Sequence, residues 1–151
     1  MTRGSARRPR GALLLAALGA ACWLAAAIAA ETKLPAADWR AIQQVIAAQR
    51  AAIVAGDADK AFALASPGIR QQFGDAATFL AMVDAAYAPL ESARYVEFLE
   101  GAVIDGIVLQ PLRLIDADNT VRVALYTMEK QADGRWRISS CRIAPSTVRA
   151  A

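Results

Sequence analysis

The order of the helix and strand patterns constrains this chain more than any other feature. Helical patterns fill residues 38–88, and strand patterns joined by tight turns fill residues 94–143. Helices followed by consecutive strands are typical of an α+β domain. We therefore expect three N-terminal helices packed on a curved four-stranded antiparallel sheet, whose concave side forms a pocket.

The first helical stretch has one apolar stripe. Asp38 is expected to cap a helix that runs to about Ala55, with Gln49 among the polar positions off the stripe. The stripe consists of Trp39, Ile42, Val45, Ile46 and Ile53. Gly56 stands where a left-handed glycine ends a helix, and Asp57 is placed to cap a second, short helix.

Proline and glycine residues punctuate the rest of the helical half. Ser66-Pro67-Gly68 is expected to stop the second helix, because proline cannot donate to the helix ladder, and residues 69–73 are expected to form a single turn. Gly74-Asp75 opens a third helix, which Pro89 ends. Its apolar stripe consists of Phe79, Met82, Val83 and Ala86.

The second half predicts four strands and three turns. The strands are expected at about residues 94–103, 107–115, 120–130 and 135–143. Asp105-Gly106 and Asp133-Gly134 are strong hairpin signals, and residues 116–119 supply the remaining turn. Pro111 removes a ladder donor, so an edge position or a bulge is expected there.

The first thirty residues carry the marks of an export signal. Four arginines lie within the first ten residues, and residues 11–30 carry no charge. Ala27-Ile28-Ala29 provides the small-x-small cleavage pattern of a secretory signal peptide. Because an apolar run of about 20 residues can also span a bilayer, an uncleaved membrane anchor is the alternative. Cys22 resembles a lipoprotein site only loosely. Each version places the domain outside the cytoplasm, in the periplasm or anchored to the inner membrane.

The charge balance changes once this segment is set aside. Four of the 17 Lys and Arg residues precede residue 11, whereas all 14 Asp and Glu residues follow residue 30. Thirteen basic residues then face 14 acidic ones, which leaves no basic surface of the kind that binds nucleic acid. We expect residues 31–37 to be a linker, residues 38–144 to be one domain, and residues 145–151 to be a flexible tail.

The residue types exclude several kinds of chemistry. The chain has no His, and Cys141 is the only cysteine after the leader, so neither an intramolecular disulfide nor a Cys-His nucleophile is expected. Cys141 is expected to pack as a small apolar residue in the last strand. No carboxylates have metal-ligand spacing, and no glycine-rich phosphate loop is present, so we expect neither a metal nor a cofactor.

Several short motifs resemble a known family. They are Gly56-Asp57, Ala61-Phe62, residues 65–70, Phe73-Gly74, Phe79, Met82-Val83, Tyr87, residues 133–138 and Cys141-Arg142. Over about residues 38–144 they resemble a bacterial domain-of-unknown-function family, DUF4864, which belongs to the nuclear transport factor 2-like (SnoaL-like, cystatin-like) superfamily. The resemblance implies a cone-shaped α+β fold and no particular activity, since the superfamily contains isomerases, dehydratases and cyclases as well as non-catalytic binding and dimerisation modules.

The resemblance also suggests where a site would lie. In the superfamily's enzymes, acid–base groups lie inside the cone, and the candidates here are Asp84 with Tyr87, Tyr95 or Tyr126. Asp84 lies beside the third apolar stripe, so solvent exposure is the alternative. Arg70 follows a Pro-Gly turn near Phe73 and has the reach to bind an anion at the cone mouth, or else to form a local salt bridge.

Three arginines on successive strands allow two arrangements. Arg113, Arg122 and Arg137 either form one basic stripe on a sheet face or alternate outward into water. The strand register that decides between these arrangements cannot be obtained from the pattern alone.

Three functions fit these observations. The first is an exported, non-catalytic domain that binds a small apolar or amphipathic ligand, with Arg70, Phe73, Tyr87 and Tyr126 as binding candidates, or a partner protein. The second is a cofactor-free lyase or isomerase that uses a pocket carboxylate and a tyrosine. The third is a structural module that forms a homodimer through the exposed sheet face. The absence of His favours the first.

Overall fold

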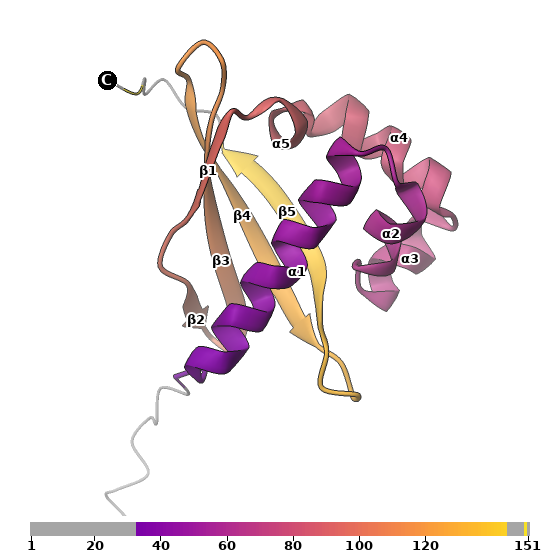
Figure 1. The fold of residues 1–151 in the computed structure, drawn as a ribbon. Helices are drawn as coiled ribbons and strands as arrows, with labels where there is room; N and C mark the ends of the chain where they lie inside the picture. Colours follow the sequence, from indigo (N-terminus) through magenta and orange to yellow (C-terminus); the bar gives the residue numbers. More distant parts are fainter. Residues whose placement is uncertain (1–32, 145–149, 151) are drawn as a thin grey trace, which may run out of the picture. The chain divides into compact units, whose positions relative to one another are not determined.

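The computed structural model describes residues 33–144 and 150, which form an α+β domain (Figure 1). The helices are α1 (Ala36–Val54), α2 (Ala58–Ala63), α3 (Pro67–Phe73), α4 (Ala76–Ala86) and α5 (Ala88–Ser92). The strands are β1 (Tyr95–Phe98), β2 (Ala102–Ile104), β3 (Ile107–Ile115), β4 (Val121–Lys130) and β5 (Trp136–Ala144). The predicted leader, and the predicted tail except Ala150, lie outside the described residues. Among the described helices, none is long and apolar enough to cross a membrane.

The five strands form one antiparallel sheet. The order is β1-β3-β4-β5, and β2 pairs with β3 along the same edge as β1. Helix α1 crosses one face of this sheet, and α2, α3 and α4 gather beside β5 (Figure 1). Helices and strands therefore occur in the predicted order, but residues 33–144 contain five helices rather than three and five strands rather than four.

The first helix begins earlier than predicted. It starts at Ala36 after Pro35, and no side chain caps it. Asp38 is therefore not the N-cap residue. Its carboxylate instead accepts hydrogen bonds from Trp136 Nε1 (2.9 Å) and Lys130 Nζ (3.0 Å), which ties the first turn of α1 to the β4–β5 hairpin. The hydrogen bond from Trp136, followed by that from Lys130, lowers the pKa of Asp38 below its ordinary value.

Two prolines that were expected to stop helices do follow helix ends, since α2 ends at Ala63 and α4 ends at Ala86, but each proline also begins the next helix. Ser66 caps α3, with Pro67 in its first turn, and Pro89 lies in the first turn of α5. A proline is tolerated there because the first turn of a helix has no acceptor for its missing N–H. The prediction that residues 69–73 form a single turn was therefore wrong. The predicted cap residues Asp57 and Asp75 are confirmed for α2 and α4.

The predicted first strand is broken into β1 and β2 where α1 packs on it. Gly101 lies in the break, and a Cβ atom there would stand 2.6 Å from Cη2 of Trp39 and closer still to Cζ3. Only glycine allows the backbone to approach the indole ring so closely. This contact with α1 lies at the break that divides the one predicted strand into β1 and β2.

Pro111 lies in a strand with neighbours on both sides, so the predicted edge position is wrong. The predicted bulge is found opposite it: Phe98 pairs with Leu112 and Ala102 pairs with Leu109, so three residues, 99–101, face Gln110 and Pro111. The Pro111 carbonyl accepts from Leu99 N (3.1 Å), but Pro111 has no N–H to return to Leu99 O. The side-chain amide of Gln110 supplies that bond, with Nε2 2.7 Å from Leu99 O. This role explains why Gln110 is completely buried.

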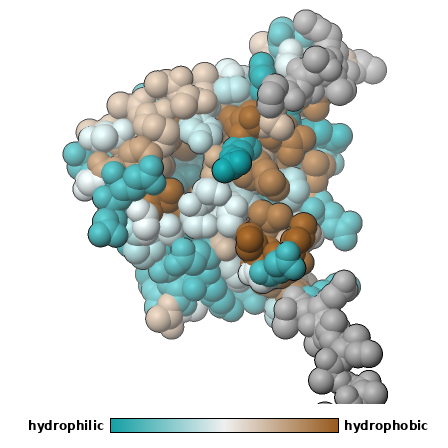
Figure 2. All heavy atoms as spheres, turned by 180° about the vertical axis from the view of Figure 1, so that it is seen from behind, coloured by the Kyte–Doolittle hydropathy of each residue, from teal (hydrophilic) through white to brown (hydrophobic). Residues whose placement is uncertain are grey.

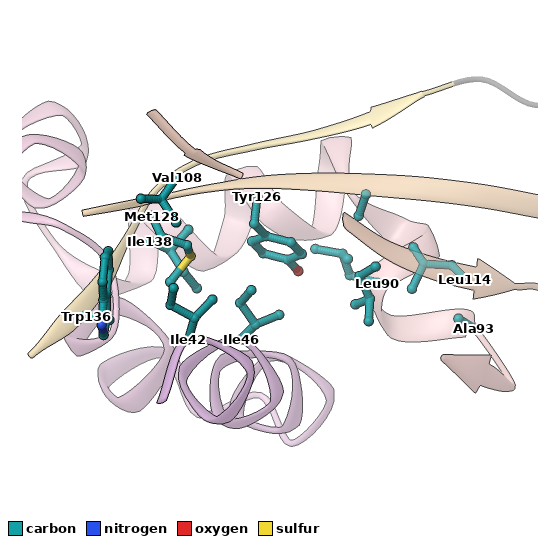
Figure 3. Packing of buried hydrophobic residues seen from close by; sticks show 12 residues of the cluster. Ile42, Ile46, Leu90, Ala93, Val108, Leu114, Tyr126, Met128, Trp136 and Ile138 are labelled. Carbon is teal, nitrogen blue, oxygen red and sulfur yellow. The ribbon is translucent and has the colours of Figure 1, made fainter. Parts of the chain in front are cut away.

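The buried apolar side chains form two clusters. The main core lies between α1 and the sheet and includes Ile42, Ile46, Leu112, Leu114 and Tyr126 (Figure 3). The helical cluster joins α1, α2 and α4 and consists of Ala52, Ile53, Ala61, Phe79 and Val83. Tyr87 packs against both clusters, at the end of α4.

The outer face of the sheet, turned away from α1, carries exposed apolar side chains. Tyr95, Ile104, Ile107 and Leu125 are 37–55% exposed, and Figure 2 shows apolar patches on this side of the molecule. The three strand arginines do not form one stripe. Arg113 lies on the outer face and forms an ion pair with Glu97. Arg122 lies opposite the inward-facing Leu114 in the strand pairing, so it belongs to the inner face, where it forms an ion pair with Asp116.

Candidate functional site

A pocket of about 180 Å³ opens between the helices and the last strand. Its walls come from α1, α3, α4, α5 and β5, together with Ala65 and Tyr87 of the connecting segments. The lining residues are Gln49, Ile53, Ala65, Ile69, Gln72, Phe73, Phe79, Met82, Val83, Tyr87, Leu90, Ile138, Ser140 and Cys141. These described lining residues include no Asp, Glu, Lys or Arg. The pocket thus lies where the main core and the helical cluster meet.

One wall of the pocket is aromatic and is held in place by helix caps. The rings of Phe73 and Phe79 meet edge to face with their centroids 5.8 Å apart. Gly74, at φ +79°, ends α3, and the Asp75 carboxylate accepts from Thr78 N (2.7 Å) to start α4. This tight connection brings the end of α3 against the first turn of α4, so Phe73 reaches Phe79.

The wall formed by β5 is polar but neutral. The Tyr87 hydroxyl donates to the backbone carbonyl of Cys141 (2.9 Å), which fixes the end of α4 to the strand. Burial raises the pKa of the Cys141 thiol to about 12, so the thiol is protonated at neutral pH. The thiolate is the nucleophilic form, and Cys141 therefore acts as the small packing residue that the sequence predicts. The Ser140 hydroxyl donates to Thr127 Oγ1 (2.9 Å).

Gln49 contributes the most buried polar side chain of the pocket. It is 4% exposed, and its Nε2 donates to the Ala61 carbonyl (3.1 Å). Among the hydrogen bonds of the described residues, its Oε1 receives none. The sequence pattern placed Gln49 among the polar positions off the apolar stripe and gave no sign that it is buried.

Tyr126 lies in the main core rather than in the pocket wall. Its side chain is 1% exposed, and its hydroxyl has no partner among the described residues (Figure 3). Burial raises the pKa of Tyr126 well above its ordinary value, and the neighbouring Cys141 raises it further. Arg50 of α1 also interacts with Tyr126, while its own Nη2 donates to the Ala93 carbonyl (2.9 Å).

The structure brings together only some of the predicted site residues. Phe73 and Tyr87 line the pocket. Arg70 lies on α3 but is exposed, and its side chain makes no hydrogen bond or ion pair within the described part of the chain. Asp84 is exposed on α4, and Tyr95 is exposed on the outer face of the sheet. Neither lines the pocket.

Residues that the site hypotheses missed form much of the pocket. Met82 and Val83 were read only as core residues of the third stripe, although the spacing of that stripe with Phe79 already placed them on one helix face. In residues 33–144 and 150, no three metal-ligating side chains lie close enough to hold an ion.

The fold and the pocket define a small α+β domain with a neutral, mostly apolar pocket between its helices and an antiparallel sheet. The family model described as "Domain of unknown function (DUF4864)" matches residues 35–151, and the chain belongs to this family. No curated protein and no solved structure matches the chain.

Proposed function

We propose that this chain is an exported, non-catalytic domain that binds a small apolar or amphipathic ligand in the pocket beside β5. The observation that carries the proposal is the pocket itself, a space of about 180 Å³ whose described lining residues are uncharged and mostly apolar. Small-molecule sites are typically concave, apolar and supplied with a few fixed polar groups. The basic and apolar leader supports the export.

The proposal includes the cone-shaped fold of the nuclear transport factor 2-like superfamily. One long helix lies across the inner face of the sheet, and the remaining helices close the side next to β5 (Figure 1). In such a fold the ligand would lie between the sheet and the helices, and Phe73 and Tyr87 already lie there. Arg70, on the same helix as Phe73, would contact an anionic group outside the pocket.

The lyase or isomerase alternative requires a carboxylate that reaches a substrate in the pocket. Asp84 is exposed and is not among the lining residues, and the hydroxyl of Tyr87 is already donated to Cys141 O. A pocket of this composition has little means of moving a proton, so we favour binding over catalysis.

A second candidate function rests on a different surface. The apolar side chains of Tyr95, Ile104, Ile107 and Leu125 favour a homodimer through the outer sheet face. Analytical ultracentrifugation of the wild-type domain and of the Leu125→Glu variant tests this role, because a charge on that face would dissociate such a dimer. A wild-type monomer at micromolar concentration would exclude it.

Native mass spectrometry of the protein recovered from a bacterial host tests the main proposal. A retained small-molecule adduct is expected, with loss of about thirty residues if the leader is cleaved. Val83→Phe fills the pocket and should remove the adduct, whereas Val54→Phe, at a residue of α1 that is 54% exposed, should keep it. An adduct retained by both variants, or a clean wild-type spectrum together with no binding of small aromatic probes, would contradict the proposal.

A further inference from the structure

Three polar side chains of the pocket wall donate hydrogen bonds within the protein. The Tyr87 hydroxyl donates to Cys141 O, and the Ser140 hydroxyl donates to Thr127 Oγ1. Gln49 Nε2 donates to Ala61 O, which fixes the orientation of its carboxamide. In the described part of the chain, Gln49 Oε1 accepts no hydrogen bond, and the side-chain amide of Gln72 makes none.

Gln49 is buried whereas Gln72 is exposed, so Gln49 Oε1 is the amide acceptor for a ligand inside the pocket. The side chain is 96% buried, and no donor in the described residues reaches its oxygen. The fully buried side-chain atoms that lack a partner in the described residues do not include Gln49 Oε1, so this oxygen keeps contact with the open space of the pocket that Gln49 lines. A ligand that brings an O–H or N–H into the pocket would satisfy it.

The size of the pocket limits the body of such a ligand. An engineered apolar cavity of about 150 Å³ is known to hold benzene, so a space of about 180 Å³ holds one six-membered ring with one or two substituent atoms. The edges and faces of Phe73 and Phe79, with the thioether of Met82, offer the contacts that aromatic rings prefer.

We propose that the pocket selects a single-ring aromatic ligand that carries one hydrogen-bond donor, of the phenol type, and that this donor binds Gln49 Oε1. The inference rests on the proposed binding function and adds the class of ligand to it. A phenol hydroxyl directed at Gln49 leaves the ring against Phe73, Phe79 and Val83.

The test compares two ligands of similar size, of which only one carries a hydrogen-bond donor. Phenol and toluene have the same shape, and their dissociation constants can be measured by ligand-observed NMR on the same wild-type domain. One additional hydrogen bond is worth about threefold to tenfold in affinity, so phenol should bind tighter than toluene by about that factor. Tighter or equal binding of toluene would overturn the inference while leaving a binding pocket. Absence of binding by either probe would overturn the proposed function as well.

A variant locates the effect at Gln49. Gln49→Met should retain toluene binding and lose the preference for phenol, and Gln44→Met, at an exposed position of the same helix, should change neither. A preference for phenol that survives in Gln49→Met would assign the donor to another acceptor and overturn the inference. Since Gln49→Met also loses the bond to Ala61 O, the comparison of ligands on the wild type stands by itself if the variant does not fold.

Discussion

The two halves of α1 face very different surroundings. In the first three turns, Ile42 and Ile46 are fully buried against the sheet, where the main core is filled. In the second half, Gln49 and Ile53 are almost as buried, yet they border an open pocket. About one turn of helix therefore separates core side chains, such as Ile46, from side chains that line the pocket, such as Gln49. The difference indicates that burial alone does not mark a residue as structural.

The largest expected effect tests this difference directly. Ile46→Ala should lower the free energy of unfolding by about 2–5 kcal/mol, since it leaves a cavity in a filled core. Ile53→Ala enlarges an existing pocket, and it should cost less. Urea denaturation of the two variants measures both values. Equal losses would mean that the two ends of α1 pack alike.

The next effect concerns the break between β1 and β2. Gly101→Ala should cost about 1–3 kcal/mol of unfolding free energy, because the new methyl group overlaps the indole ring of Trp39. Gly68→Ala is the matched control, since a Cβ atom there meets only Ser66 Oγ at 3.8 Å. If both substitutions prove equally harmless in thermal unfolding, Trp39 does not explain the break.

The replacement of a backbone donor by Gln110 can be tested with a double-mutant cycle. Gln110→Leu should cost about 1–3 kcal/mol, because it leaves the partly buried Leu99 O without its donor. In a Pro111→Ala background the restored N–H can bond Leu99 O, so the same change should cost less. Chemical denaturation of the four proteins gives the coupling free energy between the two substitutions. A coupling free energy of zero would show that the Gln110 side chain does not replace the missing backbone donor of Pro111.

The smallest effect involves the cap of the helix that carries Phe79 and Val83. The hydrogen bond from Thr78 N lowers the pKa of Asp75 below its ordinary value. The ionised carboxylate therefore stabilises the fold above the ordinary carboxyl pKa, and this contribution is lost as the pH falls through the lowered value. Asp75→Asn retains a cap without the charge, so its melting temperature should fall less on acidification. If acidification lowers the melting temperature of the wild type and of Asp75→Asn by the same amount, this assignment is contradicted.

The local parts of the fold were predictable from sequence. The strand at residues 107–115 matches β3, and Asp105 and Gly106 both have the positive φ that their hairpin requires. The helix ends before Pro67 and Pro89 were predicted correctly. The helices that these prolines begin were not predicted, because a residue that stops one helix also suits the first turn of the next. The bulge opposite Pro111 was one of the two predicted placements. The contact of Gly101 with Trp39 was not predictable, since Trp39 lies far away in sequence.

The pocket was predictable only through its aromatic residues. Phe73 and Tyr87 were named as binding candidates, and both line it. Tyr126, Arg70 and Asp84 were named by residue type, but packing places one in the core and the other two in solvent. The burial of Gln49 was not predicted, because a glutamine off an apolar stripe usually faces water. Gln49 is buried beside α2, where its side chain donates to Ala61 O.

Methionine methyl NMR tests the central claim, that the pocket binds a small ligand while the main core stays closed. Of the three methionines, Met82 lines the pocket and Met128 lies in the main core at 4% exposure, so one label reports on both regions. Titration with phenol should shift the Met82 methyl resonance with saturation and leave that of Met128 nearly unchanged. Equal movement of both signals, or movement of neither, would contradict the account.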